Sequence, residues 1–255
     1  MRSAVGAFLL RVSLVRSRSF RLTLYDLIRR THWLRTDVAP FTLYRDWRDE
    51  QFERFGLAEL YGRFDEEFLR EYPGKLDRIG MVLQVLEASK SAAGDVVEFG
   101  VFKGHTAVAL DAALERSGST KRLFLFDSFA GMPPSAHPLD RHWQTGDLTS
   151  DALRLERVFQ DSTRVQIVPG FFSESLPKWP ALRFSFCHID CDLFSSTMEC
   201  LEYVHPRLSP GGAVVFDDFG FRRCGGARQA VEEFASRHSL SYLTLPTGQA
   251  VYFKS

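Results

Sequence analysis

The sequence predicts an α/β fold: a Rossmann-like, doubly wound and mainly parallel sheet of seven strands, preceded by helices. From Gly94 onward, short apolar runs typical of buried strands alternate with runs of helical periodicity, as in sheets whose parallel strands are joined by right-handed helical crossovers. Near the C-terminus, two apolar runs flank the turn Pro246–Gly248, which is typical of a hairpin and adds an antiparallel strand to the sheet. With 255 residues, 45% of them hydrophobic, the chain is long enough for one large core.

Helical periodicity marks the region before the sheet, residues 37–92. Apolar side chains recur there at spacings of three and four residues, and Pro73–Gly74 separates two groups of them. These positions are Phe52, Phe55 and Leu60, then Leu76, Ile79, Val82, Leu83 and Leu86. We therefore predict at least two amphipathic helices ahead of the first strand.

The alternating region predicts five strands and four helices in turn. The strands are expected at residues 95–99, 122–127, 164–168, 184–190 and 211–217, and the helices near residues 104–117, 149–160, 194–206 and 226–238. The terminal hairpin brings the sheet to seven strands. One connection is long: residues 129–147, which include His142, have the length of a lid or binding loop.

Residues 1–36 form a basic arm. Seven arginines and the single acid Asp26 lie between Met1 and Leu34. The apolar run Ala4–Leu10 is much shorter than the roughly 20 residues of a membrane span. Three interpretations stay open: a solvated or partly helical arm, an organellar transit peptide, and weak contact with an anionic membrane surface.

Charge and cysteine content argue against some classes of protein. The chain has 32 Lys and Arg against 32 Asp and Glu, and a formal net charge of zero argues against nucleic acid as the main partner. The four cysteines lie in the last third of the chain without a CxxC pair. We therefore expect a reducing, cytoplasmic compartment, with neither disulfides nor a zinc site.

Two predicted strands end on pairs of acids. Asp190 and Asp192 close the fourth strand, and Asp217 and Asp218 close the fifth. Ligands of open parallel sheets bind beyond the carboxyl ends of the strands, which lie about 4.8 Å apart, so these acids are expected to converge. Crowded carboxylates repel one another unless a cation or a substrate proton lies among them. Their all-oxygen chemistry suits Mg²⁺, Ca²⁺ or Mn²⁺.

The first strand leads into a turn of the form ExGxxxG, with Glu98, Gly100 and Gly104 at its defined positions. The glycines allow a ligand to approach the backbone closely at the positive end of the following helix. A dinucleotide fingerprint would be GxGxxG, whereas an acid before the first glycine favours a ligand with a cationic group, such as S-adenosylmethionine. Asp127 ends the second strand, where an acid accepts hydrogen bonds from ribose hydroxyls.

Six sequence blocks, in order, give the chain a resemblance to the macrocin and mycinamicin sugar O-methyltransferase family over about residues 94–235. The blocks are residues 94–104 (GDVVEFGVFKG), 127–133 (DSFAGMP), 168–177 (VPGFFSESLP), 189–197 (IDCDLFSST), 211–219 (GGAVVFDDF) and 230–234 (AVEEF). The resemblance implies a class I methyltransferase fold over residues 93–255, with residues 37–92 as a cap on the acceptor side. It also implies metal-dependent methyl transfer from S-adenosylmethionine to a sugar hydroxyl, by a homodimer or higher oligomer.

The resemblance further implies roles for individual residues. Asp190, Asp217 and Asp218 correspond to the ligands of a magnesium ion, and Asp192 to the proposed general base. Ser128 and Asp190 are also expected to contact the cofactor. The family usually has GVWRGG, DGDLY and DDY where this chain has GVFKGH, DCDLF and DDF, so two tyrosine hydroxyls are absent and the acceptor stays undetermined.

Other interpretations of these residues stay open. Asp217 and Asp218 could cap the following turn, and Asp192 could cap the next helix. His188, within a buried strand, is more typical of a core histidine than of a ligand, and His142 in the long loop is a candidate substrate contact or alternative base. The alternative functions are a metal-independent small-molecule methyltransferase and a non-catalytic cofactor-binding or membrane-associated protein.

Overall fold

The computed structural model describes Phe55 and residues 75–255, which belong to a compact unit spanning Phe55–Ser255. The predicted basic arm and the predicted helical extension before residue 75, apart from Phe55, lie outside the described residues. Of residues 75–77 only the backbone is described. No helix in the described part of the chain has the length and apolar character that crossing a membrane requires.

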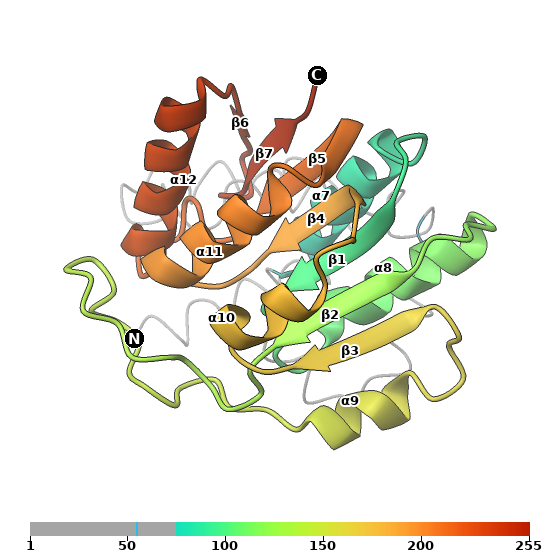
Figure 1. Ribbon diagram of the computed structural model, residues 1–255, viewed down its shortest axis with the longest axis horizontal. Coiled ribbons are helices and arrows are strands. Elements are labelled where there is room, and N and C mark those ends of the chain that lie inside the picture. Colours follow the sequence, from blue (N-terminus) through green and yellow to red (C-terminus); the bar gives the residue numbers. More distant parts are fainter. Residues whose placement is uncertain (1–54, 56–74) are drawn as a thin grey trace, which may run out of the picture. The chain divides into compact units, whose positions relative to one another are not determined.

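The sheet has seven strands in the order β3-β2-β1-β4-β5-β7-β6 (Figure 1). Their bounds are β1 Asp95–Phe99, β2 Leu123–Asp127, β3 Val165–Pro169, β4 Phe184–Ile189, β5 Leu208–Phe216, β6 Leu243–Thr244 and β7 Ala250–Phe253. The first five strands are parallel, whereas β7 runs antiparallel to β5 and β6. This confirms the predicted doubly wound sheet with an antiparallel C-terminal hairpin.

The fifth strand begins earlier than predicted. Pro210, Gly211 and Gly212 are typical of a turn, so the sequence places the start of the strand at Gly211. In the structure, Leu208 already pairs with Phe184, and the register between β4 and β5 then shifts before Ala213 pairs with Phe186. A bulge therefore carries the glycine segment within the strand.

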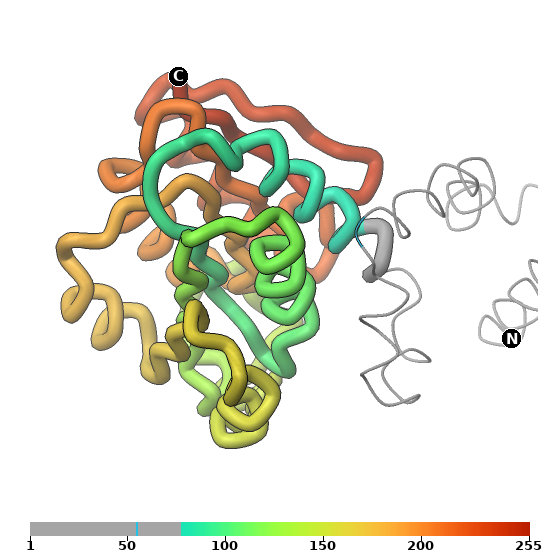
Figure 2. Tube along the Cα trace, turned by 90° about the vertical axis from the view of Figure 1, so that its right-hand side faces the viewer, coloured from blue at the N-terminus to red at the C-terminus, as the bar shows by residue number. Residues whose placement is uncertain are grey.

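Helices cover both faces of the sheet. Their bounds are α7 Lys75–Ala88, α8 His105–Arg116, α9 Ala152–Val158, α10 Phe172–Ser175, the 3₁₀ turn η2 Leu176–Lys178, α11 Phe194–Val204 and α12 Gly225–His238. In Figure 1, α10, α11 and α12 lie on one face and α7, α8 and α9 on the other. Figure 2 shows α7 beside α8, with which it is in contact. The sequence did not predict α10 and η2, which are too short to show a helical period.

The core of this unit is rich in phenylalanine. Phe99, Phe124, Phe126, Phe184 and Phe186 are completely or almost completely buried on strands β1, β2 and β4. All of them except Phe186 belong to one buried cluster, on the face of the sheet that α11 and α12 cover. The rigid centre of the sheet holds the carboxyl ends of β1, β2, β4 and β5 in fixed register, and those ends carry the predicted site.

The long connection at residues 129–147 is anchored rather than free. The carboxylate of Asp140 accepts hydrogen bonds from the Phe194 backbone N–H, at 3.2 and 3.3 Å, and from the Ser135 hydroxyl at 2.6 Å. The His137 ring stacks on the Phe194 ring with centroids 4.2 Å apart. Asp140 also contacts Gly226, where a larger residue would clash with its carboxylate. The predicted lid therefore rests on the N-terminal ends of α11 and α12.

Candidate active site

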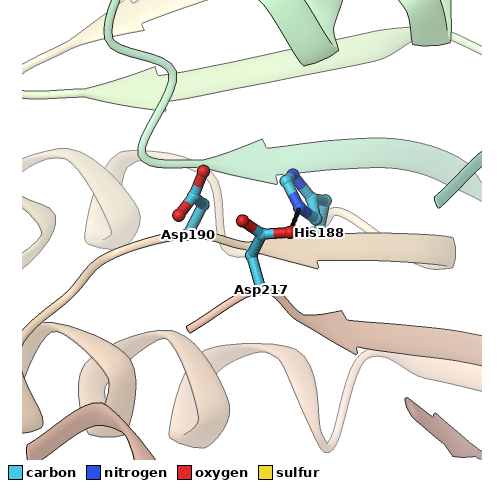
Figure 3. Close-up of side chains that lie close together, drawn as sticks. All are labelled: His188, Asp190 and Asp217. Atoms are coloured by element: carbon cyan, nitrogen blue, oxygen red, sulfur yellow. Dashed lines mark ion pairs between the residues drawn. The ribbon is translucent and has the colours of Figure 1, made fainter. Parts of the chain in front are cut away.

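Asp190 and Asp217 meet at the carboxyl ends of two neighbouring strands. Ile189 pairs with Phe216 in the β4–β5 ladder, and the Asp217 backbone N–H donates to the Ile189 carbonyl at 2.9 Å. Their side chains lie close together, and that of Asp217 is beside the His188 ring (Figure 3). One carboxylate oxygen from each acid and one His188 ring nitrogen lie within 4.8 Å of one another.

Asp192 and Asp218 form a second group at the same edge. The Asp192 backbone N–H donates to Asp218 Oδ2 at 2.9 Å, and the Cys224 thiol donates to Asp192 Oδ1 at 3.0 Å. Asp192 has a φ of 60°, in the left-handed region that residues other than glycine rarely adopt. The four acids therefore converge as the sequence predicts, but as two subgroups, with Asp218 grouped with Asp192 and Cys224 and not with Asp190.

A cation already lies among these acids: the guanidinium of Arg78, from the first turn of α7. Arg78 Nη2 donates to Asp217 Oδ2 and, at 2.6 Å, to the Asp217 carbonyl, and it lies 3.9 Å from Asp218 Oδ1. Burial opposes the charge of Arg78, but Asp217, Asp190 and Asp218 outweigh it and raise the Arg78 pKa. On the other side, the Gln249 side-chain amide donates to Asp217 Oδ1 at 2.6 Å.

The two adjacent acids of the fifth strand are in opposite electrostatic environments. Burial alone would raise the pKa of Asp217, but Arg78, His188 and Gln249 together hold it well below its usual range. Burial also raises the pKa of Asp218, and the neighbouring Asp192, Asp190 and Asp217 raise it further, well above its usual range. Arg78, His188 and Gln249 thus stabilise the charged form of Asp217, whereas Arg78 only partly offsets the effect of burial and neighbouring acids on Asp218.

A buried histidine connects the acid group to the first strand. His188 Nδ1 lies 3.1 Å from Glu98 Oε1, and His188 Nε2 lies 3.4 Å from Asp217 Oδ1, an ion pair without hydrogen-bond geometry. Burial disfavours the charged ring, but its interactions with Asp217 and Glu98 outweigh burial and raise the His188 pKa to about 10. Burial raises the pKa of Glu98 to about 7, against the effect of His188. His188 is therefore a partnered core histidine, and its partners are site acids.

The predicted cofactor turn lies directly against the acid group. Gly100 (φ 82°) packs on the Asp190 carbonyl so closely that any side chain would overlap it, and Gly104 (φ 86°) precedes α8 and packs on Leu155. The Asp190 backbone N–H donates to the Phe99 carbonyl at 2.9 Å. Both glycines are therefore required by close contacts within the protein, and the approach of a ligand to this backbone stays a prediction.

Asp127 organises this turn through its carboxylate. Oδ2 accepts the backbone N–H groups of Val101 and Phe102 at 2.7 and 2.8 Å, and Oδ1 accepts the N–H of Phe129 at 2.7 Å. The Ser128 hydroxyl donates to the Gly131 carbonyl at 2.8 Å, within the following loop. Asp127 thus fixes the turn after β1 and the turn after β2, a role that the ribose hypothesis did not include.

His142 stands apart from the other predicted residues. Its side chain is exposed in the anchored loop, and its ring meets the edge of Trp143 at a centroid distance of 4.6 Å. Within the described part of the chain, His142 is not in either group of potential metal ligands. Its candidacy as substrate contact or alternative base has no support from these contacts.

Sequence reasoning missed three residues of the site: Arg78, Cys224 and Gln249. Arg78 reads as one charge among several in an amphipathic helix, and Gln249 as part of a hairpin turn. Both are 32 or more positions from Asp217 in sequence. Gln249 is completely buried, but the sequence offers no sign of that burial.

Comparison with known proteins identifies the family of the chain. The family model for macrocin O-methyltransferase (TylF) matches residues 74–254. The 8-demethyl-8-(2,3-dimethoxy-α-L-rhamnosyl)-tetracenomycin-C 4'-O-methyltransferase of Streptomyces olivaceus is 32% identical over 220 residues, covering 80% of this chain and 76% of the relative. The mycinamicin III 3''-O-methyltransferase of Micromonospora griseorubida is 31% identical over 162 residues, covering 58% of this chain and 63% of the relative.

Solved structures agree on the fold. The O-methyltransferase NovP superposes with a TM-score of 0.64 at 24% identity, covering 71% of this chain and 80% of that chain. The calicheamicin methyltransferase CalS11 superposes with a TM-score of 0.61 at 20% identity, covering 80% of this chain and 91% of that chain. The strand order and the antiparallel β7 are those of a class I methyltransferase. The chain belongs to the macrocin O-methyltransferase (TylF) family and is an S-adenosylmethionine-dependent O-methyltransferase.

Proposed function

We propose that the enzyme methylates a hydroxyl of a sugar, in a glycoside, nucleotide-sugar or glycan, with a hard divalent cation such as Mg²⁺ held by Asp190, Asp217 and Asp218. The sugar acceptor is supported by the tetracenomycin relative, whose name places its methyl group on a rhamnosyl-bearing compound. The observation that supports the cation is that partly buried Asp190, at the end of β4, and buried Asp217, at the end of β5, have carboxylate oxygens within 4.8 Å of each other, with buried Asp218 next in the chain.

The donor set fits a hard divalent cation. All three predicted ligands are carboxylates, the chemistry that Mg²⁺ prefers. Asp218 has a strongly raised pKa because burial and three neighbouring acids disfavour its negative charge, so the group still lacks positive charge with Arg78 present. A bound divalent cation would act as a Lewis acid and lower the pKa of an acceptor hydroxyl.

The residues of the chain have distinct parts in the proposed reaction. The acceptor oxygen attacks the methyl carbon of the sulfonium, the carbon–sulfur bond breaks, and the hydroxyl proton passes to Asp192. The Asp192 carboxylate is held in place by the Cys224 thiol, and its backbone by Asp218. Most of the rate gain is expected from holding oxygen and methyl in line at near-attack distance.

The cofactor side follows from the glycine turn and its acids. Glu98 Oε2 is buried and has no hydrogen-bond partner among the described residues, so it is available to the cationic amino group of S-adenosylmethionine. We propose Gly100, Gly104, Asp127, Ser128 and Asp190 as the other cofactor contacts.

A second candidate is methyl transfer without a metal, and Arg78 favours it. Its guanidinium already lies on Asp217 and near Asp218, so positive charge reaches the acid group from the protein itself. In this alternative the acids orient the acceptor hydroxyl and Asp192 accepts its proton without Lewis-acid assistance.

The test is an assay of the full-length enzyme with S-adenosylmethionine and a panel of rhamnosylated aglycones, nucleotide-sugars and glycans. We expect S-adenosylhomocysteine with at least one sugar acceptor, loss of turnover after EDTA treatment, and recovery with Mg²⁺. Turnover unchanged by EDTA would favour the metal-independent reaction. Cofactor binding without product from any sugar would refute the proposed acceptor class.

The surroundings of this domain also stay proposals. We propose a basic arm over residues 1–36 that makes weak contact with anionic membrane surfaces, and an acceptor-side cap formed by residues 37–92. We further propose that the enzyme is a cytoplasmic homodimer or higher oligomer. Size-exclusion chromatography with light scattering measures the oligomeric state directly.

A further inference from the structure

We propose that Arg78 is a resident counter-ion of the acid group that competes with the metal, so that metal binding requires its guanidinium to leave Asp217 and Asp218. This inference rests on the metal site of the proposed function. It assigns a role to a residue in α7, outside the sequence blocks that carry the family resemblance. The inference rests on the position of one side chain among the three proposed ligands.

The guanidinium lies where it excludes a second cation. Arg78 Nη2 contacts Asp217 Oδ2 and the Asp217 carbonyl, and Asp218 Oδ1 is 3.9 Å away. Asp190 is close enough to contribute to its electrostatic environment. A metal ion bound to the same carboxylates would lie within a few ångströms of this positive charge, in a partly buried site where like charges repel strongly. Both cations cannot hold Asp217 in this arrangement.

The surroundings allow the side chain to leave while the helix stays. The Gln249 amide bridges Asp217 Oδ1, at 2.6 Å, and the Arg78 backbone carbonyl, at 3.2 Å. This bridge ties α7 to the acid group independently of the guanidinium. Arg78 Nε is buried without a hydrogen-bond partner among the described residues, so the guanidinium is incompletely satisfied where it lies.

A resident counter-ion reduces the electrostatic repulsion among the acids when no metal is bound. Four carboxylates at one sheet edge repel one another, and burial strengthens the repulsion. Arg78 offsets part of that repulsion in the metal-free protein, and the same contact must be broken when a metal enters. Removing Arg78 is therefore expected to strengthen metal binding and to weaken the metal-free fold.

The test compares Mn²⁺ binding by metal-free, full-length proteins, measured from the electron paramagnetic resonance signal of free Mn²⁺. Arg78→Met should bind Mn²⁺ about tenfold more tightly than wild type, because a competing buried ion pair is gone. Arg78→Lys, which keeps the charge but loses the planar fork, should be intermediate. Arg164→Met is the matched control. The Arg164 side chain is 24% exposed and pairs with Asp111, and the Arg78 side chain is similarly 19% exposed. Loss of Arg164 should leave the Mn²⁺ affinity unchanged.

A second readout is the melting temperature. In EDTA, Arg78→Met should melt below wild type, and Mn²⁺ should raise its melting temperature more than that of wild type. If Arg78→Met does not fold without metal, the Mn²⁺ affinity of Arg78→Lys is compared with that of wild type. Equal affinities of these two proteins would overturn the inference.

The outcomes separate this inference from the proposed function. Measurable Mn²⁺ binding by wild type with equal or weaker binding by Arg78→Met would overturn the counter-ion role and leave the metal site standing. Binding by Arg78→Met alone would support the counter-ion role and refute metal dependence of the natural enzyme. Absence of binding by all variants at millimolar Mn²⁺ would overturn both.

Discussion

The two sides of the crevice are held together by different forces. On the cofactor side, at the ends of β1 and β2, one carboxylate, Asp127, is satisfied by three backbone N–H groups. On the acid side, at the ends of β4 and β5, Asp217 is satisfied by side chains from α7, β4 and the residue before β7.

This difference separates a rigid half from an exchangeable half. Backbone N–H groups have no rotamers and cannot leave, so the cofactor side is organised before any ligand arrives. A side-chain cation such as Arg78 can change rotamer, and in the proposed function a metal ion would take its place. The contrast predicts that mutations on one side change cofactor affinity and mutations on the other change turnover.

The largest expected effect is on the acid side. Asp217→Asn keeps the shape of the side chain and removes its charge. We expect turnover to fall about 10³-fold, because in the proposed mechanism both metal binding and acceptor activation depend on this charge. Affinity for S-adenosylhomocysteine, measured by calorimetry, should stay within a fewfold of wild type. Asp111→Asn, which changes an acid paired with Arg164 outside the crevice, is the control. An Asp217→Asn enzyme with normal turnover would refute the metal site.

On the cofactor side, we expect a mutation to change cofactor affinity more than turnover. Asp127→Ala leaves three backbone N–H groups without their acceptor, and we expect about hundredfold weaker binding of S-adenosylhomocysteine because hydrogen bonds to a charged group are the strong kind. Turnover at saturating cofactor should change much less. Ser128→Ala, which removes only loop-internal hydrogen bonds, should weaken binding less than Asp127→Ala. Equal cofactor affinity in Asp127→Ala and wild type would contradict the prediction that mutations on this side change cofactor affinity.

The buried histidine that joins the two sides predicts a pH dependence of stability. His188 has its pKa raised from 6.5 to about 10, so between these values the folded protein binds a proton that the unfolded chain does not. The stabilisation is complete below pH 6.5 and is lost as the pH rises toward 10. The free energy of unfolding in EDTA should fall by up to about 1.4 kcal/mol for each pH unit in this window. Urea titrations at several pH values measure this slope, and a flat or rising profile would contradict the buried imidazolium.

The smallest expected effect concerns the support of the proposed base. Cys224→Ala removes the thiol that donates to Asp192 Oδ1, and we expect about fivefold lower turnover, the worth of one hydrogen bond. The acid limb of the pH–rate profile should move to higher pH, because the carboxylate loses a bond that favours its charged form. Cys224→Ser keeps a donor and should restore both readouts. If Cys224→Ser and Cys224→Ala behave alike, the hydrogen bond has no part in catalysis.

The sequence by itself determined the fold and the edge of the sheet where the four acids lie. Apolar runs that end on Asp127, Asp190 and Asp217 set strand ends, and neighbouring parallel strands bring those ends together whatever the details of packing. The glycines at positions 100 and 104 likewise predicted a turn with positive φ after the first strand. These features are local patterns, and local patterns are what a single sequence contains.

Only the tertiary structure decided which cation faces which acid. Arg78 lies 139 positions from Asp217, and Gln249 lies 32 positions away on the opposite side of it in the chain. The split of the acids into two groups depends on the left-handed backbone of Asp192 and on the thiol of Cys224. Contacts of this kind depend on how a helix and a hairpin dock on the sheet, and the charge of a residue in the sequence carries no information about the partner it will meet.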